Sequence, residues 1–167
     1  MPEIRTKHLW MASWTIERVD AALFDKEQLS QNLSAVIPDD FPNEPVSLYV
    51  LPKLRVDLRN DLSVGNWSGI IIHSEDSIVI GSMGFKSTPD ERGTIEIGYD
   101  IIPAYQGNGY ATEMASAMVE WAFQQPGVQK VTAQCLKDNL ASIRVLQKTG
   151  LHEVSRSDEL ISWELNR

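Results

Sequence analysis

The sequence is poor in cysteine, in basic side chains and in long hydrophobic runs. Its 167 residues include a single cysteine, Cys135, which excludes an internal disulfide framework and a metal site built from several cysteines. Lys and Arg total 15 against 23 Asp and Glu, and this net charge of −8 argues against binding of a nucleic-acid backbone, which needs clustered basic groups. The longest aliphatic runs, such as 70–72 and 78–80, fall far short of the roughly 20 residues that cross a membrane. We therefore expect neither a nucleic-acid partner nor a membrane partner.

The start of the chain and the histidines exclude two further classes of protein. Residues 1–14 are interrupted by charged side chains and lack the apolar stretch of a secretory signal, so we expect a cytoplasmic protein. His8, His73 and His152 are dispersed without the spacing of metal ligands, so no metal site is predicted. What is present is apolar material: 43% of the residues are hydrophobic, enough for a core of one domain over 1–167. Because a lone cysteine on a strand is usually buried, we expect Cys135 to be a small buried apolar residue.

The distribution of apolar residues predicts an α/β (α+β) fold. Strands are expected at 8–14, 67–73, 77–85, 94–102, 128–136, 151–156 and 160–165, and helices at 16–24, 26–35, 51–62, 110–124 and 139–149. Short turns join the three strands between 67 and 102, which predicts an antiparallel meander. In the strand over 94–102, alternation places Ile95 and Ile97 on one face and Glu96 and Asp100 on the other. The pattern predicts one mixed, largely antiparallel sheet of about seven strands flanked by helices.

A short loop at 103–109 joins a predicted strand to a predicted helix and contains Gly107 and Gly109. A helix N-terminus presents unpaired N–H groups, and glycines remove the Cβ atoms that would keep a phosphate from the backbone. A P-loop is excluded because Tyr110-Ala111 stands where it needs Lys and Ser or Thr, and a dinucleotide fingerprint fits poorly because Thr112 replaces its third glycine. By themselves, the glycines fit an anion-binding loop and a simple tight turn equally well.

A third motif fits this loop. Gln106-x-x-Gly109-x-Ala111 resembles the acetyl-coenzyme A motif of the GNAT (GCN5-related N-acetyltransferase) family. Further segments resemble the branch of that family that acetylates ribosomal-protein N-termini (RimJ/RimL-like): 96–99, 109–113, 138–139, 142–146 and 150–151. The similarity is clear over 77–164. It implies a GNAT fold whose sheet is splayed at the acetyl-CoA site, with 67–167 as the acetyl-CoA-binding core and 1–66 as the acceptor side.

The resemblance also implies which residues bind the cofactor: Tyr99, Asp100, Ile101, Gln106, Gly107, Asn108, Gly109, Tyr110, Ala111, Thr112, Asn139 and Ser142. In such a site, the amides of 106–112 wrap the pyrophosphate of coenzyme A. The end of the preceding strand, 99–101, offers backbone hydrogen bonds to the pantetheine arm and the thioester carbonyl. Asn139 would bind near that arm, although an asparagine in this place is equally explained as a helix cap.

Acid and base groups are less clearly specified. Glu96 is the first candidate for the base, because it lies on the strand that leads into the loop; alternation makes it an ordinary surface carboxylate just as well. Related enzymes place a glutamate where this chain has Gln134 and a tyrosine acid where it has Leu146, so their mechanism does not transfer directly. Ser142 remains as an acid or a hydrogen-bond donor to the thiolate, or simply as a residue of the first helical turn.

The sequence therefore predicts an enzyme that transfers acetyl from acetyl-CoA directly to a primary amine, without an acyl-enzyme and without a metal. The acceptor is a protein N-terminal amine or a small molecule such as a polyamine, an amino acid or an antibiotic. The alternative is a non-catalytic sensor module that holds coenzyme A or an acyl-CoA. A homodimer is a further expectation from the family resemblance.

Overall fold

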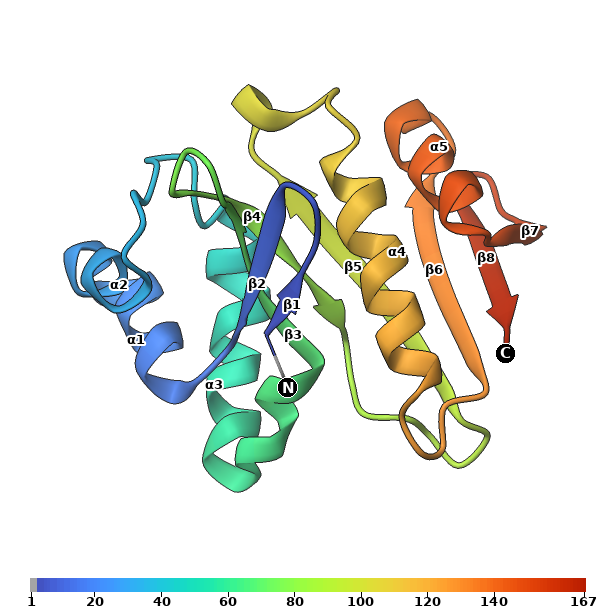
Figure 1. Ribbon diagram of the computed structural model, residues 1–167. Helices are drawn as coiled ribbons and strands as arrows, with labels where there is room; N and C mark the ends of the chain where they lie inside the picture. The colour runs from blue at the N-terminus through green and yellow to red at the C-terminus, as the bar shows by residue number, and fades with distance from the viewer. Residues whose placement is uncertain (1–2) are drawn as a thin grey trace.

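The chain forms one continuous eight-stranded sheet in the order β1-β2-β3-β4-β5-β6-β8-β7 (Figure 1). The computed structural model describes residues 3–167. The strands are β1 (Ile4–Arg5), β2 (Leu9–Ser13), β3 (Ser68–His73), β4 (Ile78–Phe85), β5 (Thr94–Ile101), β6 (Lys130–Leu136), β7 (His152–Arg156) and β8 (Leu160–Asn166). The α-helices are α1 (Ile16–Phe24), α2 (Lys26–Leu33), α3 (Leu51–Asn60), α4 (Tyr110–Phe123) and α5 (Leu140–Thr149). The predicted mixed, largely antiparallel sheet is confirmed, and the additional strand is the two-residue β1.

Local sequence explains where most helices begin and end. Thr15 caps α1 by accepting a hydrogen bond from a first-turn amide, and Asp25 does the same for α2. The helix predicted over 26–35 ends earlier because Ser34 adopts a left-handed conformation with φ of 52°. Gly150, with a φ of 102°, ends α5, as a glycine directly after a predicted helix indicates. The five predicted α-helices are therefore confirmed to within a few residues at each end.

Three short helical segments were not predicted. They are η1, a π-helical turn (Val46–Val50), and two 3₁₀ turns, η2 (Leu62–Trp67) and η3 (Pro103–Tyr105). Each is too short to show a periodic apolar pattern, and the prolines before η1 predict only an interruption of helical structure. Among residues 3–167, no helix combines the length and the apolar character needed to cross a bilayer.

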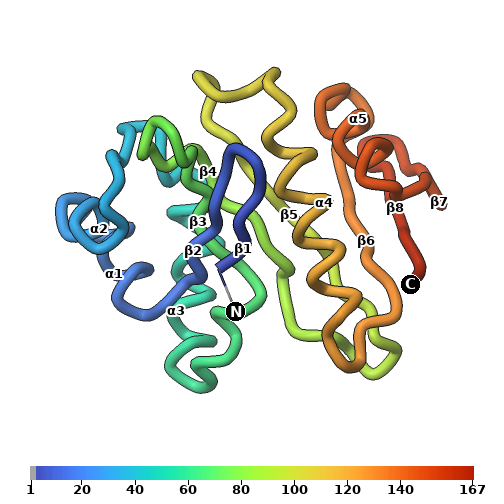
Figure 2. Tube along the Cα trace, viewed as in Figure 1, coloured from blue at the N-terminus to red at the C-terminus, as the bar shows by residue number. Residues whose placement is uncertain are grey.

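The sheet opens between β5 and β6. The two strands are parallel and pair only at their beginnings, where 94–96 lie opposite 130–132. Beyond that point β5 is bonded on one side only, by β4, whose residues 81–85 pair with 97–101. Figure 2 shows the two traces diverging toward the end of β5 that leads into η3. This part of β5 therefore presents one unpaired backbone edge, as the family resemblance predicts.

The two faces of β4 and β5 carry different elements. The ring of Trp67 contacts Phe85 of β4 at 6.2 Å between centroids and Trp121 of α4 at 5.2 Å. Phe85 lies opposite Ile97 in the β4–β5 ladder, so α4 covers the face that carries the buried Ile95 and Ile97. Figure 1 shows α4 in front of the sheet and α3 behind it. Alternate residues of β5, among them Glu96 and Asp100, consequently face away from α4.

Candidate functional site

A cleft of about 570 Å³ lies where β5 ends, between the loop that leads into α4 and the first turns of α5. Most of the residues predicted to bind a cofactor line it: Tyr99, Asp100, Ile101, Gln106, Gly107, Gly109, Tyr110, Ala111, Thr112, Asn139 and Ser142. Asn108 and Glu96 do not. Six further lining residues were not predicted: Asn43, Tyr105, Ala141, Arg144, Val145 and Lys148. The fold thus brings together residues from β5, from the loop and from α5.

The loop that begins α4 leaves its backbone open to the cleft. Gly107 and Gly109 both have left-handed φ angles, 79° and 82°, and a Cβ atom added at either would meet nothing within 4 Å. No side chain caps α4, so the N–H groups of its first turn, which lack intrahelical partners, remain available. The Gln106 amide Nε2 donates to the carbonyl of Ile101 at 2.7 Å, which ties the loop to the end of β5. Asn108 turns back on the loop, donating to backbone carbonyls at 3.3 Å.

The hydroxyl of Tyr99 is the unsatisfied polar atom of the cleft. It is buried, and no residue within 3–167 offers it a hydrogen bond of normal geometry. Burial raises the pKa of this phenol, and the neighbouring hydroxyl of Ser142 partly opposes the rise. Buried hydroxyls are rarely left without a partner in a finished structure. An unpartnered hydroxyl beside an unpaired strand edge is therefore consistent with a ligand that fills this part of the cleft.

The first turns of α5 form the opposite wall. Asn139 caps the helix, its Oδ1 accepting from the amide of Ser142 at 3.1 Å, so the capping role is present whatever else this side chain does. Arg144 and Lys148 also line the cleft, one helical turn apart. Their spacing of four residues puts both cations on one face of a predicted helix. No neighbouring residue indicates that this face borders a cleft, so the sequence analysis missed them.

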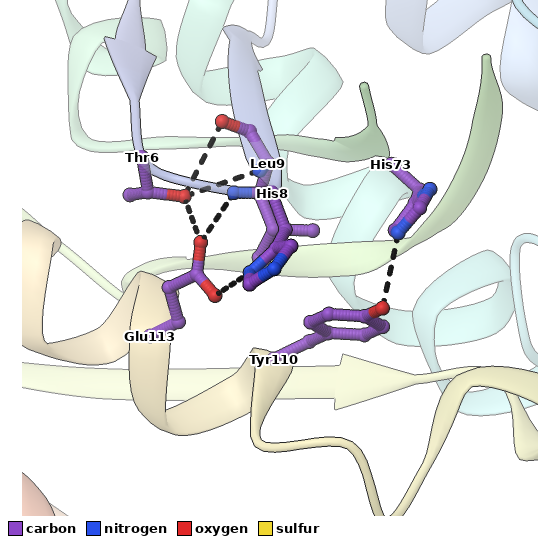
Figure 3. A network of polar contacts seen from close by, with 6 residues as sticks. All are labelled: Thr6, His8, Leu9, His73, Tyr110 and Glu113. Carbon is purple, nitrogen blue, oxygen red and sulfur yellow. Dashed lines mark hydrogen bonds and ion pairs between the residues drawn. The ribbon is translucent and has the colours of Figure 1, made fainter. Parts of the chain in front are cut away.

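A polar network fastens the start of α4 to the opposite edge of the sheet (Figure 3). Glu113 accepts hydrogen bonds from the Thr6 hydroxyl at 2.5 Å and from the backbone amide of His8 at 2.8 Å, and its second oxygen lies 2.8 Å from the His8 ring. The buried His73 of β3 places its Nε2 3.0 Å from the hydroxyl of Tyr110. The network therefore holds the first turn of α4 beside the cleft.

Two histidines that are distant in the sequence meet at Tyr110. The rings of His8 and His73 lie 5.8 Å and 5.1 Å from its ring. Tyr105 lies 5.4 Å from the His73 ring and donates a hydrogen bond of 2.7 Å to Asp76, which raises the pKa of Tyr105 to about 12. The phenol thus stays protonated. Within residues 3–167, no group of three or more His, Cys, Asp or Glu is arranged to hold a metal ion.

Two carboxylates of β5 differ sharply in their surroundings. Glu96 forms an ion pair of 2.5 Å with Lys86 and lies outside the cleft. Asp100 lines the cleft and accepts a hydrogen bond of 2.5 Å from the hydroxyl of Ser82, a buried residue on β4. Burial raises the pKa of Asp100, and hydrogen bonds from Ser82 only partly oppose this effect. Glu96, the base expected from the sequence, thus lies outside the cleft, whereas Asp100, four residues further along β5, lines it.

The remaining residues noted in the sequence have structural roles. Cys135 is buried, and the indole N–H of Trp163 donates to its sulfur at 3.3 Å, which confirms the expectation of a small buried residue. Leu146 is buried as well. Neither contributes a group to the cleft.

Comparison with known proteins identifies the family. A model described as an acetyltransferase (GNAT) domain matches residues 9–152. YjdG of Bacillus subtilis (strain 168), described as an uncharacterized N-acetyltransferase, is 30% identical over 161 residues, which cover 96% of this chain and 95% of that protein.

Solved structures share the fold along nearly the whole chain. The ribosomal-protein-S5-alanine acetyltransferase from Vibrio fischeri aligns with a TM-score of 0.70 and 14% identity, covering 99% of this chain and 97% of its own. RimL, a ribosomal L7/L12 alpha-N-protein acetyltransferase in complex with coenzyme A, aligns with a TM-score of 0.69 and 15% identity, covering 98% and 97%. Because the family model spans most of the sequence and YjdG matches from end to end, the chain belongs to the GNAT acetyltransferase family.

Proposed function

We propose that this protein transfers the acetyl group of acetyl-CoA directly to a primary amine in the cleft at the end of β5. The observation that carries the proposal is the combination, in one cleft of a GNAT family member, of an unpaired strand edge and an uncapped helix N-terminus. The first is suited to an extended arm rich in amides, and the second is suited to a pyrophosphate. Coenzyme A contains both groups.

The loop over 106–112 is the proposed site of the pyrophosphate. No side chain caps the first-turn amides of α4, and the positive end of the α4 dipole favours an anion there. Arg144 and Lys148 add two positive charges on the facing wall. A protein with a net charge of −8 can thus hold a polyanionic cofactor through local groups, without a basic surface.

The unpaired edge of β5 over 99–101 is the proposed site of the pantetheine arm and the thioester. A backbone N–H directed at the thioester carbonyl would stabilise the negative charge that develops there as the amine attacks. The strand would also hold the acetyl donor next to the acceptor amine. This positioning lowers the entropic cost of bringing the two reactants together in a direct transfer. Bound acetyl-CoA supplies the activated acetyl group for this reaction.

Ser142 and Tyr99 are the proposed hydrogen-bond donors to the departing sulfur. Ser142 lines the cleft at the start of α5, and the buried hydroxyl of Tyr99 lies beside it without another partner. Two hydroxyls in this place can stabilise a thiolate in a chain where the tyrosine of related enzymes is replaced by Leu146.

The acceptor side is proposed to be formed by residues 1–66. Asn43, in the segment between α2 and η1, supports this because it reaches the cleft from that half of the chain. Protein N-terminal amines and small-molecule amines both remain candidate acceptors. The assignment of Glu96 as base, the homodimer and the cytoplasmic location stay predictions from the sequence.

Calorimetric titration with acetyl-CoA and a thiol-release assay over a panel of primary amines test the proposal together. We expect saturable binding, and thiol release that depends on both acetyl-CoA and an amine. Mass spectrometry of the acceptor should show one acetyl group added. Tight binding without thiol release on any amine would instead identify a coenzyme A sensor, and absence of binding would overturn both functions.

A further inference from the structure

Acetyl transfer to an amine that is protonated in solution needs a group that removes a proton. Among the described residues that line the cleft, Asp100 is the one acidic residue, and no histidine or cysteine is present. We propose that Asp100 binds the ammonium group of the acceptor and is the base that deprotonates it. This inference rests on the proposed acetyl transfer and assigns the base of that reaction.

The position of Asp100 on β5 places it on the acceptor side of the strand. Tyr99 and Ile101 flank it and point to the α4 face, where the loop and α5 form the proposed cofactor site. The side chain of Asp100 points to the opposite face, toward Ser82. An amine that approaches from this face would thus meet the carboxylate beside the backbone that holds the thioester.

On the face of β5 that carries Asp100, the space above Gly98 is open. On this face of the β4–β5 ladder, the pair Ser82/Asp100 is followed by the pair Gly84/Gly98. Ser68 and the backbone before it fill the space above Gly84, but a Cβ atom added at Gly98 would have only the Cε atom of Lys86, at 3.5 Å, within 4 Å. The strand therefore leaves room beside the carboxylate for the chain that carries the amine.

The charge of Asp100 has no partner among the described residues. Burial raises its pKa and hydrogen bonds with Ser82 partly oppose this rise, without a contribution from a charged side chain. On the same face of β5, Glu96 pairs with Lys86, and Arg144 and Lys148 belong to the α5 wall of the cleft. A half-buried carboxylate of this kind is stabilised by an incoming cation, and its raised pKa makes it a stronger base.

The chemistry balances with these groups alone. The ammonium gives one proton to the Asp100 carboxylate, and the neutral nitrogen then attacks the thioester carbonyl carbon. The C–N bond forms, the C–S bond breaks, and the electron pair of that bond leaves with the sulfur. The second nitrogen-bound proton neutralises the thiolate, and Asp100 returns its own proton to solvent.

The Asp100→Asn variant tests the assignment because the amide can still accept the Ser82 hydrogen bond but cannot take up a proton. The assay is thiol release over a range of pH with three probes: spermidine, Ala-Phe amide and hydroxylamine. The first two are largely protonated near neutral pH, whereas hydroxylamine is neutral. The matched control is Asp57→Asn, a carboxylate on α3 that pairs with Lys53 away from the cleft.

For Asp100→Asn we expect kcat/KM with a protonated amine to fall about 100-fold, with loss of the acid limb of the pH profile. Hydroxylamine should be affected far less, and calorimetric affinity for acetyl-CoA should be unchanged, which separates lost chemistry from lost folding. Unaltered kcat/KM in Asp100→Asn with an active wild-type enzyme would overturn this assignment alone. An equal loss with hydroxylamine would also contradict a role as base. If the wild-type protein releases no thiol with any probe, the proposed function and this assignment both fail.

Discussion

The hydroxyl of Ser82 donates a 2.5 Å hydrogen bond to the carboxylate of Asp100 across the β4–β5 ladder. The two residues are register partners, so the pairing of the strands holds their backbones side by side. The bond occurs where β5 is no longer paired with β6 and where the cleft begins. Ser82 consequently orients the carboxylate that we assign as the base.

The Ser82→Ala substitution should change the pH dependence of the reaction. The hydrogen bond from Ser82 favours the ionised carboxylate, so its removal should raise the pKa of Asp100 further. We expect the acid limb of the kcat/KM profile to move to higher pH, with kcat at its plateau reduced by less than in Asp100→Asn. Ser82→Thr, which keeps the hydroxyl, should restore the original limb. A parallel loss at every pH in both variants would indicate a purely structural role.

Replacement of the Asp100 carboxylate should increase the stability of the protein. Because the folded-state pKa of Asp100 is raised above its ordinary value, the folded state loses stability as pH rises through that pKa and the group ionises. For Asp100→Asn, we expect the free energy of unfolding at neutral pH to rise on the order of 1 kcal/mol, because a half-buried charge without an ionic partner is removed. Urea unfolding at neutral pH and at acid pH checks this. The gain should shrink at acid pH, where the wild-type group is already neutral.

Alanine substitutions at two glycines with the same backbone conformation distinguish an effect on cofactor binding from an effect of backbone strain. Gly109 has φ of 82° in the cleft, Gly127 has φ of 85° after α4, and a Cβ atom would meet nothing within 4 Å at either. Alanine at either position should cost about 1 kcal/mol of stability, through the left-handed backbone. Only Gly109→Ala should weaken calorimetric binding of coenzyme A, by about ten-fold, equal to roughly 1.4 kcal/mol. Equal affinities in both variants would place the pyrophosphate elsewhere.

Arg144 and Lys148 should contribute to cofactor affinity through charge. Each lines the cleft on α5, so Arg144→Gln and Lys148→Gln should each weaken coenzyme A binding roughly five-fold, or about 1 kcal/mol, at low salt. The effect should diminish at high ionic strength, because exposed charges are screened. Lys53→Gln, on α3 and outside the cleft, is the control that should leave the dissociation constant unchanged. A loss of affinity that is independent of salt would contradict an electrostatic contribution.

The contact between Glu113 and the start of the chain should weaken in acid. Burial acts to raise the pKa of Glu113, but hydrogen bonds from Thr6 and His8 outweigh it and lower the pKa. A carboxyl with a lowered folded-state pKa adds stability above its unfolded pKa of about 4.3, and that stability is lost as pH falls through the folded value. Glu113→Gln should cost about 0.5 kcal/mol at neutral pH and less in acid. Urea unfolding at both pH values measures this, and a cost that does not change with pH would contradict it.

The local motif was sufficient to predict the loop and the helix that follows it. The spacing of Gln106, Gly109 and Ala111 is a local property, and both the left-handed turn and the uncapped helix start follow from neighbouring residues. Strand alternation likewise identified the buried face of β5 correctly. Period-2 and period-3.6 patterns are properties of short windows, so these elements were accessible without knowledge of the rest of the chain.

The comparison of Glu96 with Asp100 shows what such patterns leave undetermined. Both lie on the same face of β5, and alternation treats them alike. They differ because β5 is paired with β6 at Glu96 but not at Asp100. They also differ in their partners, since Glu96 pairs with Lys86 and Asp100 accepts a hydrogen bond from Ser82. These are contacts between residues far apart in the sequence.

By itself, then, the sequence determined the order of the five α-helices and of the strands β2 to β8, the acetyl-CoA-type loop and the family, because each is encoded in short runs of residues. The tertiary structure decided which carboxylate enters the cleft, which cations of α5 face it, and that His73 of β3 meets Tyr110 of α4. The physical reason is that burial, charge pairing and the environment of a titratable group depend on strand register and on the packing of distant segments. One pair of strands that separates after three residues creates the cleft and sets Asp100 apart from Glu96.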